Sequence, residues 1–536
     1  MAAFALIPEL LFRFSCGKCL AASLPCAYTA VNSRIPEHEV SVIQTLEVPV
    51  TPATAEGPNR LLTMGTVLLF AITLAVTVVR GIGDAPREFD YPYAYVSADV
   101  STMARTFAQV GIFHLHGMPV NNNPPIDSLD FYPHWPPLLP IVLSVCFRVF
   151  GVSERVAHLL MLCVLVTTAM LVFRVGQRWL GTTGGAMAGF FWLTLPVTLQ
   201  FGHLVVYQPL MTMFMVAAVL AFVEGRDAMG AVLLFLGTLS SWEIVLVAVG
   251  LLLASRWRPQ LRRPAVAAGI GAGAGILCVA ALYLWNSPQL AVEALEYAKF
   301  YMGMSSSNLH LLASQQIQIS AWEQIRRMLL NNAWMLGPIG LGAVLQLGKV
   351  RVPNQGLILV SLATPWAVWC VVMKNHMARH HFELVIAAPL VALALAWMAV
   401  TPSGKQLGKI VALTAAVGVQ ILIFPKPVIN DGYDPTALIR YAQDIRQATE
   451  PNAIVMAPLH SAVPLYYSER HIVREISGAE AIAQQLPILR REFPGSPIYF
   501  AVPQSLAGDL PAGRVVSATS DAIIVTLPLH KSGQAN

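Results

Sequence analysis

The sequence predicts a polytopic α-helical membrane protein with about eleven transmembrane helices and a small C-terminal extramembrane α/β domain. Three observations predict this class. Hydrophobic residues make up 56% of the 536 residues and charged residues only 12%, whereas a globular protein carries roughly 25% charged residues. The mean hydropathy is +0.60. Long apolar runs recur between residues 61 and 425, and the later sequence alternates helical and short β-rich runs.

Charge and cysteine content exclude two classes of function. The net charge is +5 and the basic residues form no long block, so nucleic-acid binding is not favoured. Seven cysteines in a chain of this length give no disulfide framework. The expected environment is therefore the lipid bilayer.

Eleven apolar runs are candidates for transmembrane helices. A helix needs about 17–25 apolar residues to cross a bilayer, and shorter runs cross only with tight turns or a thinned bilayer. The long runs are 61–81, 154–174, 183–201, 204–223, 265–285, 355–373, 382–399 and 408–425, and the shorter runs are 228–241, 242–255 and 333–348.

Basic residues between these runs indicate the orientation of the chain, because Lys and Arg concentrate in short cytoplasmic loops. The basic connectors carry Arg174 and Arg178, then Arg256, Arg258, Arg262 and Arg263, then Lys349 and Arg351, and finally Lys405 and Lys409. All of them fall on one side if the run 134–151, which opens with paired prolines, lies along the membrane surface or re-enters. The N-terminus is then predicted in the cytoplasm and the C-terminus outside.

Three parts follow from this topology. Residues 1–60 are expected to form a disordered N-terminal cytoplasmic extension. Residues 61–425 form the transmembrane part, whose outer loop 82–153 carries surface helices. Residues 426–536 form the α/β domain, which we expect on the periplasmic or extracellular side.

The outer loop contains a carboxylate in an unusual setting. The segment DVSTMARTFAQVG, residues 99–111, has the period of an amphipathic helix, with Asp99 near the N-cap and Gly111 at the end. Charged groups close to a bilayer are expensive and usually serve a site or a pathway. Two interpretations stay open here: Asp99 caps a surface helix, or it belongs to a reactive site.

A basic segment, KNHMARHHFE at 374–383, lies on the predicted outer side, against the positive-inside tendency. A phosphate would account for it, since cationic side chains form strong charge-assisted hydrogen bonds with phosphate. The candidate phosphate ligands are Lys374, Arg379, His380 and His381. Interfacial anchoring by these cations stays an alternative. A metal site formed by His376, His380 and His381 is less favoured, because no set of carboxylates accompanies them.

Three motifs resemble those of a known superfamily. Residues 97–111 fit SADxSxxARxFxxxG, residues 132–138 read YPHWPPL, and residues 150–155 read FGVSER. In this order and topology they resemble the GT-C superfamily of membrane glycosyltransferases, especially bacterial relatives of protein O-mannosyltransferases and aminoarabinose (lipid A) transferases. The similarity is densest over residues 85–225.

The resemblance implies an enzyme of the bacterial inner (plasma) membrane. Such a glycosyltransferase moves a sugar from a polyprenyl-phosphate-linked donor to a hydroxyl of a lipid, protein or envelope-polymer acceptor. The transfer takes place on the outer face, with inversion at the anomeric carbon. No cofactor is firmly implied and a divalent metal is not favoured, since Gln208 stands where relatives carry an acidic residue.

The resemblance also implies roles for particular residues. A carboxylate of the first outer loop is the catalytic base; Asp99 is the first choice, with Asp130, Asp90 and Asp84 as alternatives. Better-known members place an Asp-Glu pair further upstream, where this chain has Val96 and Ser97. Arg105 joins the candidate ligands of the donor phosphate. The candidate substrate-lining residues are Tyr132, His134, Trp242 and Glu243.

Two other classes of function remain alternatives. A transporter or flippase of a lipid-linked sugar has a similar hydropathy, but such proteins usually show inverted repeats and charges inside the membrane. A non-catalytic subunit of envelope assembly would use the C-terminal domain for contacts with partners. The sequence shows no repeat, and its unusual charges lie in outer loops, which favours the transferase.

Overall fold

The computed structural model describes residues 60–91, 93–126, 130–304, 320–347, 354–401, 406–423, 434–459, 461–474, 476, 478–504 and 513–527. All of them belong to one compact unit, Pro58–Asn536. The extension predicted at 1–60 lies, apart from Arg60, outside the described residues.

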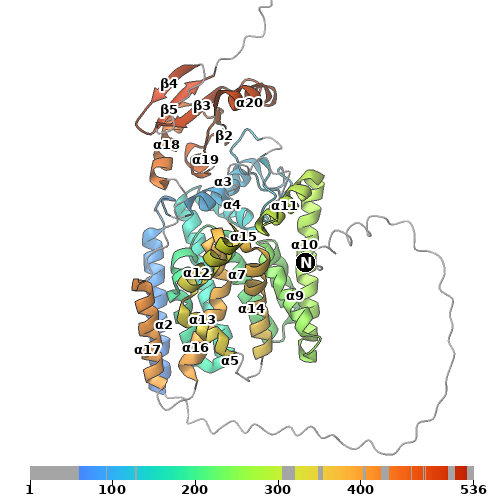
Figure 1. Cartoon of the computed structure of the whole chain (residues 1–536), viewed down its shortest axis with the longest axis vertical. Helices are drawn as coiled ribbons and strands as arrows, with labels where there is room; N and C mark the ends of the chain where they lie inside the picture. The colour runs from blue at the N-terminus through green and yellow to red at the C-terminus, as the bar shows by residue number, and fades with distance from the viewer. Residues whose placement is uncertain are drawn as a thin grey trace, which may run out of the picture. The chain divides into compact units, whose positions relative to one another are not determined.

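The described residues between 60 and 423 form a body of helices (Figure 1). Each apolar run that the sequence marks as a span is helical. The elements are α2 (Arg60–Asp84), α5 (Glu154–Thr194), α6 (Pro196–Phe201), α7 (Tyr207–Val223), α8 (Asp227–Thr238), η2 (Trp242–Ile244), α9 (Val245–Ala254), η3 (Pro259–Leu261), α10 (Arg262–Asn286), α12 (Ala321–Leu336), α13 (Pro338–Gln346), α14 (Gln355–Val372), η6 (His381–Ala387), α16 (Ala388–Val400) and α17 (Gln406–Ile423).

Five of these helical segments are long and apolar enough to cross a bilayer, or six if the bent pair α12 and α13 counts as one span. Five more apolar helices within the described residues are shorter. In α5, Gly181 adopts φ 76° and ψ 179° and breaks the helix between two predicted runs, a conformation that glycine adopts without steric strain. The number of about eleven crossings stays a prediction.

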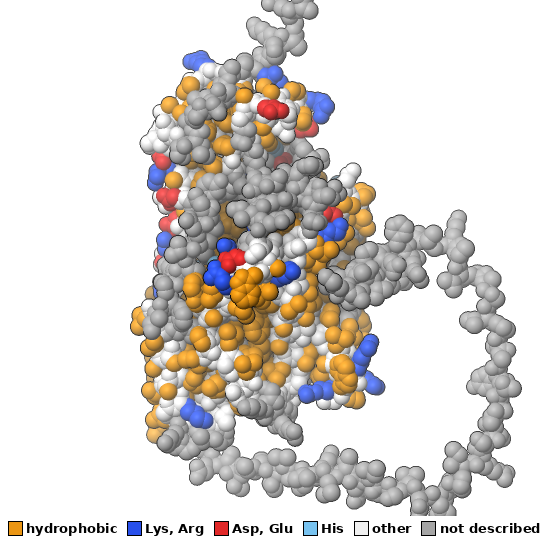
Figure 2. Space-filling view, in the orientation of Figure 1, with side chains coloured by type: hydrophobic (Ala, Val, Ile, Leu, Met, Phe, Trp, Pro, Cys, Tyr) orange, Lys and Arg blue, Asp and Glu red, His pale blue; other side chains and the backbone are white. Residues whose placement is uncertain are grey.

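The surface of the helical body is apolar. Figure 2 shows hydrophobic side chains spread over the body, with blue Lys and Arg side chains along its lower edge. Large apolar side chains stand exposed on it, among them Leu61, Val76, Ile270 and Leu284. A soluble protein rarely exposes so extended an apolar surface. The chain is therefore an integral membrane protein.

Among the described residues before 424, four more helices lie outside the predicted transmembrane runs: α3 (Ala94–Val110), α4 (Leu138–Phe150), α11 (Pro288–Tyr301) and α15 (Lys374–Arg379). Helix α3 ends at Gly111, as the sequence predicts, with φ 111° at that residue. The prediction of Asp99 near the N-cap is wrong. The helix begins at Ala94, because Tyr93, Ala94 and Ala98 are buried and extend its packed face upstream. Asp99 stands inside the helix and does not cap it.

The run 134–151 forms α4 after Pro136 and Pro137. This helix has 13 residues, fewer than the about 17–25 that cross a bilayer, and it contacts α3 and α5. Its place along the membrane surface stays a prediction.

The described residues from 434 onward contain a five-stranded mixed sheet with three helices. The elements are α18 (Pro435–Ala448), β1 (Ile454–Met456), α19 (Val463–Ser468), β2 (His471–Val473), α20 (Gly478–Glu492), β3 (Ile498–Pro503), β4 (Arg514–Ala518) and β5 (Ala522–Thr526). The strand order is β2-β1-β3-β5-β4, with β1 parallel to β2 and β3, and β5 antiparallel to β3 and β4. Because these residues belong to the same compact unit as the helices, a separate extramembrane domain stays a prediction.

Candidate functional site

The N-terminal end of α3 meets the basic segment 374–383. The hydroxyl of Tyr93 donates to the carbonyl oxygen of Arg379 at 2.9 Å and lies 2.9 Å from Nδ1 of His381. The hydroxyl of Tyr95 lies 3.4 Å from Nδ1 of His380. These contacts join the two segments in which the sequence placed the catalytic base and the phosphate ligands.

A stack of aromatic rings lies beside this junction. The ring of His134 stacks on Tyr297 at 4.3 Å between centroids and on Tyr301 at 5.0 Å. The hydroxyl of Tyr132 lies 3.0 Å from Nδ1 of His134, and Trp242 Nε1 donates to the His134 carbonyl at 3.2 Å. The structure thus brings together three of the four predicted lining residues. The two tyrosines of α11 are not among the predicted lining residues; their spacing of four residues, which puts them on one helix face, is the signal in the sequence.

The imidazoles near this stack are neutral. Burial lowers the pKa of His134 and of His376 to about 3, and the charge of Arg379 contributes a smaller lowering at His376. Burial also lowers the pKa of His380 well below its ordinary value. The rings of His376 and His380 lie 4.4 Å apart, and His376 meets Tyr301 edge-on at 4.1 Å. A neutral His380 offers a phosphate one N–H group but no charge, and its place among the phosphate ligands stays a prediction.

Two carboxylates lie fully buried next to these rings. Gln208 Nε2 donates to Glu383 at 2.7 Å and to Glu243 at 3.3 Å, so one amide bridges both. Ser241 donates to Glu243, and Trp369 Nε1 donates to Glu383 at 3.2 Å. Glu243 is a predicted lining residue, whereas the sequence predicts no role for Glu383 and no link between the two through Gln208.

Asp99 lies in a partly buried position on the same helix as Tyr95. Its side chain is 16% exposed, and Oδ1 lies 3.7 Å from a guanidinium nitrogen of Arg474. Burial raises the pKa of Tyr132 well above its ordinary value, and the charges of Tyr207 and Asp99 raise it further. The spacing of four residues also puts Asp99 on the face of α3 that carries Tyr95.

The three alternative bases have other partners. Asp130 accepts from Asn122 at 2.8 Å and lies 3.7 Å from Nδ1 of His471. Asp90 pairs with Arg87 through both carboxylate oxygens, at 2.8 and 3.3 Å. The side chain of Asp84 is 56% exposed. Asp99 lies on the face of α3 that carries Tyr95, whose hydroxyl meets His380.

Arg105, expected at the donor phosphate, has a different set of partners. Its Nη1 donates to the Tyr466 carbonyl at 2.8 Å, and its Nη2 donates to Asn123 Oδ1 at 2.8 Å and to the Leu465 carbonyl at 3.1 Å. The guanidinium also lies over the ring of Tyr466. These contacts bind the C-terminal part of the chain to α3, and they occupy Nη1 and Nη2 of Arg105.

Lys374 and Arg379 supply positive charge at the junction. The guanidinium of Arg379 lies 5.5 Å from the ring centroid of Phe300 and donates from Nε to Asn375 at 3.3 Å. The Lys374 side chain passes Gly303 at the end of α11. Within the described part of the chain, no group of three or more His, Cys, Asp and Glu residues is arranged to hold a metal ion.

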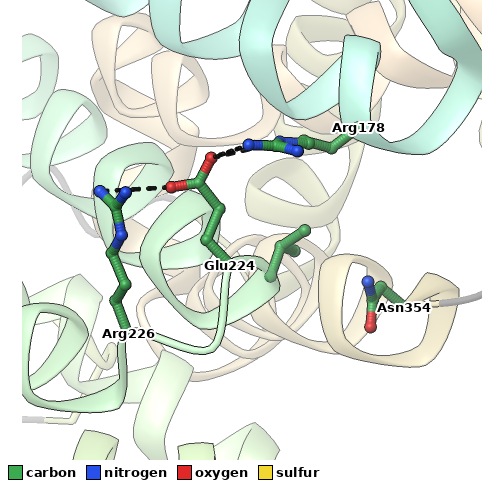
Figure 3. A pocket seen from close by; sticks show the side chains of 5 residues that line it. Arg178, Glu224, Arg226 and Asn354 are labelled. Atoms are coloured by element: carbon green, nitrogen blue, oxygen red, sulfur yellow. Dashed lines mark hydrogen bonds and ion pairs between the residues drawn. The ribbon is translucent and has the colours of Figure 1, made fainter.

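A cavity of about 340 Å³ lies elsewhere, lined by Arg178, Val223, Glu224, Arg226 and Asn354 (Figure 3). The cavity opens at the C-terminal end of α7. Gln208 lies near the N-terminal end of the same helix, about 22 Å from the cavity along the helix axis. Glu224 pairs there with Arg178 at 2.8 Å and with Arg226 at 3.4 Å. None of the predicted site residues lines it. The structure thus places the first basic connector and the candidate site at opposite ends of the helices.

No protein-family model and no curated protein matches the sequence. Several solved structures are similar to the chain, including these two. ArnT from Cupriavidus metallidurans, bound to undecaprenyl phosphate, has 13% sequence identity and a TM-score of 0.56, with 87% of this chain and 99% of that chain covered. The archaeal oligosaccharyltransferase AglB from Archaeoglobus fulgidus, in complex with an inhibitory peptide and a dolichol-phosphate, has 12% identity and a TM-score of 0.52, with 82% and 69% covered.

At these identities the likeness shows the fold alone. Both structures are members of the GT-C superfamily of membrane glycosyltransferases. The chain shares the fold of these two structures, as the resemblance to this superfamily predicts.

Proposed function

We propose that this protein is a membrane glycosyltransferase that uses a polyprenyl-phosphate-linked sugar as donor. The observation that carries the proposal is the junction of α3 with residues 374–383, in which Tyr95 contacts His380 one turn before Asp99. It puts a carboxylate and positively charged side chains on adjoining segments. The fold supports the same conclusion, since the similar ArnT and AglB structures hold undecaprenyl phosphate and a dolichol-phosphate.

The proposed reaction requires few groups from the protein. Asp99 accepts the proton of the acceptor hydroxyl while that oxygen attacks the anomeric carbon of the sugar. The bond from the anomeric carbon to the phosphate oxygen breaks, and the lipid phosphate leaves with the electron pair. A single displacement inverts the anomeric configuration. Polyprenyl phosphate is a fair leaving group, so holding both substrates in position supplies much of the rate enhancement.

The charges around the site suit the departing phosphate. Lys374 and Arg379 provide fixed positive charge for the negative charge that develops on the leaving oxygen. A neutral His380 contributes an N–H donor. The stacked rings of His134, Tyr297 and Tyr301 form a rigid aromatic wall, a common feature of small-molecule sites.

The proposal also specifies the side of the membrane on which the transfer takes place. Donor and acceptor meet on the outer face of a bacterial inner membrane, with the N-terminus in the cytoplasm. The support is the separation of the candidate site from the Arg178 and Arg226 end, because basic residues mark cytoplasmic ends of helices. The acceptor is a hydroxyl of a lipid, a protein or an envelope polymer.

A second function is favoured by one observation. Glu243 and Glu383 are buried among apolar helices, and ionisable groups inside a membrane protein often mark a transport pathway. A transporter or flippase of a lipid-linked sugar would use such a pair to carry protons. It would move labelled lipid-linked sugar between leaflets without transferring the sugar.

The test uses purified protein in nanodiscs, given radiolabelled polyprenyl-phosphate sugars and a cell-envelope extract as acceptor. Label that moves to acceptor with the wild type, and not with Asp99→Asn, supports both the transferase and its base. Equal transfer by both proteins overturns Asp99 as the base and moves the role to Asp130, Asp90 or Asp84. If folded wild-type protein transfers no sugar, and the same protein in vesicles moves the lipid across the bilayer, the flippase replaces the transferase.

A further inference from the structure

The C-terminal part of the chain is fixed to α3 and its following loop by backbone contacts. Arg105 donates to the carbonyl oxygens of Leu465 and Tyr466 at 3.1 and 2.8 Å. Asn123 Nδ2 donates to the carbonyls of Leu465 at 2.7 Å and Arg470 at 2.9 Å. Four hydrogen bonds therefore hold the backbone from residue 465 to 470. These donors are buried, where each lost bond would leave a polar group unsatisfied.

Asn122 extends this attachment into strand β2. Its Oδ1 accepts from the Ile472 N–H at 3.0 Å, and its Nδ2 donates to the Ile472 carbonyl at 3.2 Å. One side-chain amide thus satisfies both backbone groups of a single residue. This arrangement fixes the position and the rotation of β2 relative to the loop.

The fixed strand delivers a charged side chain to the candidate base. Arg474 follows two residues after Ile472, and residues i and i+2 of an extended segment point to the same side. A guanidinium nitrogen of Arg474 lies 3.7 Å from Oδ1 of Asp99, and the two side chains are 25% and 16% exposed. This distance exceeds that of a direct hydrogen bond, so the pair acts through charge.

We infer that Arg474 is a positioning residue of the transferase site, and that the C-terminal part completes the site by holding the Asp99 carboxylate. The inference rests on the proposed function. Arg474 touches neither the donor nor the acceptor in this role; it fixes the carboxylate that accepts the proton. The domain that carries the sheet is then a component of the active site, and its attachment through Arg105, Asn122 and Asn123 is a condition of activity.

A merely structural role for Arg474 makes a different prediction. A side chain that only attaches the C-terminal part would lower the melting temperature when replaced, and activity would fall with the folded fraction. A positioning role lowers kcat in protein that stays folded, because a misplacement of about 1 Å at a reacting group reduces the rate on the order of 100-fold. The affinity for the donor would stay unchanged, since the donor does not contact Arg474.

The test compares Arg474→Gln with Arg474→Lys in nanodiscs, with kcat, the KM for the donor and the melting temperature measured for each. We expect the Arg474→Gln variant to have a kcat about 10- to 100-fold lower than the wild type at an unchanged KM. The Arg474→Lys variant should keep most of the wild-type kcat, because it keeps the positive charge. Arg440→Gln is the matched control, because Arg440 pairs with Asp521 at 3.1 Å within the same part of the chain. It should keep the wild-type kcat.

Three outcomes overturn the inference. One is a wild-type kcat in Arg474→Gln. Another is a loss of kcat that follows a lowered melting temperature equally in the Gln and Lys variants. The last is an absence of transfer by the wild type with any donor, which refutes the proposed function as well; activity in the wild type separates the two failures.

Discussion

Nε2 of His376 lies 2.6 Å from Oε1 of Glu383, and both side chains are almost fully buried. The contact closes a network in which Glu383 also accepts from Gln208 and from Trp369. Nδ1 of His376 has no hydrogen-bond partner among the described residues, so the contact of Nε2 with Glu383 is the one that holds this ring.

Replacement of Glu383 by Leu should destabilise the protein strongly. The substitution leaves the N–H groups of Gln208, Trp369 and His376 without their acceptor in a buried setting, and removing one partner of such a network costs about 3–5 kcal/mol. The measurement is the melting temperature in detergent or nanodiscs. Glu383→Gln keeps an acceptor oxygen and should lose less than half as much. Equal melting temperatures for the Glu383→Leu variant and the wild type would contradict a stabilising role of this network.

Replacement of Asp99 by Asn should abolish transfer without unfolding the protein. The amide keeps the size of the side chain but cannot accept the proton, and general-base catalysis contributes about 100- to 10,000-fold. Initial rates of sugar transfer check the prediction. Asp90→Asn is the control, because its partner Arg87 lies in an exposed pair; it should lose less than tenfold. If Asp90→Asn lost more of the transfer rate than Asp99→Asn, Asp90 would be the base.

Replacement of Lys374 by Gln should weaken binding of polyprenyl phosphate about tenfold, which corresponds to about 1.4 kcal/mol. The reason is the loss of an ammonium group that makes no hydrogen bond or ion pair elsewhere in the described chain and is free to meet a phosphate. The Kd is measured with the lipid phosphate in nanodiscs at two salt concentrations. Lys299→Gln is the control, since Lys299 already pairs with Glu296. An unchanged Kd in the Lys374 variant would favour interfacial anchoring.

The sequence predicts much of this architecture because its signals are local. Apolar length marks the helices, and Gly111 ends α3 because its positive φ favours glycine. The grouping of the first outer loop with residues 374–383 followed from topology, since both lie on the same predicted side. A contact such as that of Tyr93 with His381 then required only that the two segments fold against each other.

What the sequence did not reveal depends on tertiary contacts. The start of α3 is set by the burial of Tyr93 and Ala94, which no capping pattern reports. Arg105 matched a motif, yet its donors are used by carbonyl oxygens some 360 residues away along the chain. No local spacing links Gln208 with Glu383, or Asp99 with Arg474. Each pair meets only because distant segments are brought together.

Acidification should destabilise the folded protein from about pH 6.5 downwards, and buried histidines are the reason. His134 and His376 have pKa values near 3 in the folded state, lowered by burial. Below pH 6.5 the unfolded chain therefore binds protons that the folded chain does not, and the free energy of unfolding falls as the pH falls. The contribution of the neutral histidines to the free energy of unfolding is fully present above the pKa of histidine in the unfolded chain. It is lost progressively as the pH falls towards 3.

The size of the effect is about 1–2 kcal/mol per histidine between pH 6.5 and pH 5, since each proton bound only by the unfolded state contributes about 1.4 kcal/mol per pH unit. Melting temperatures from pH 8 to pH 5 measure it. The variant His134→Phe keeps a flat ring for the stack with Tyr297 and Tyr301 but cannot titrate, so its melting temperature should fall less steeply. His114→Phe, which changes an exposed histidine outside this cluster, is the control. If the slopes of the two variants are equal, His134 is solvated and protonates normally in the folded state, and the neutral aromatic wall assigned to the site does not exist.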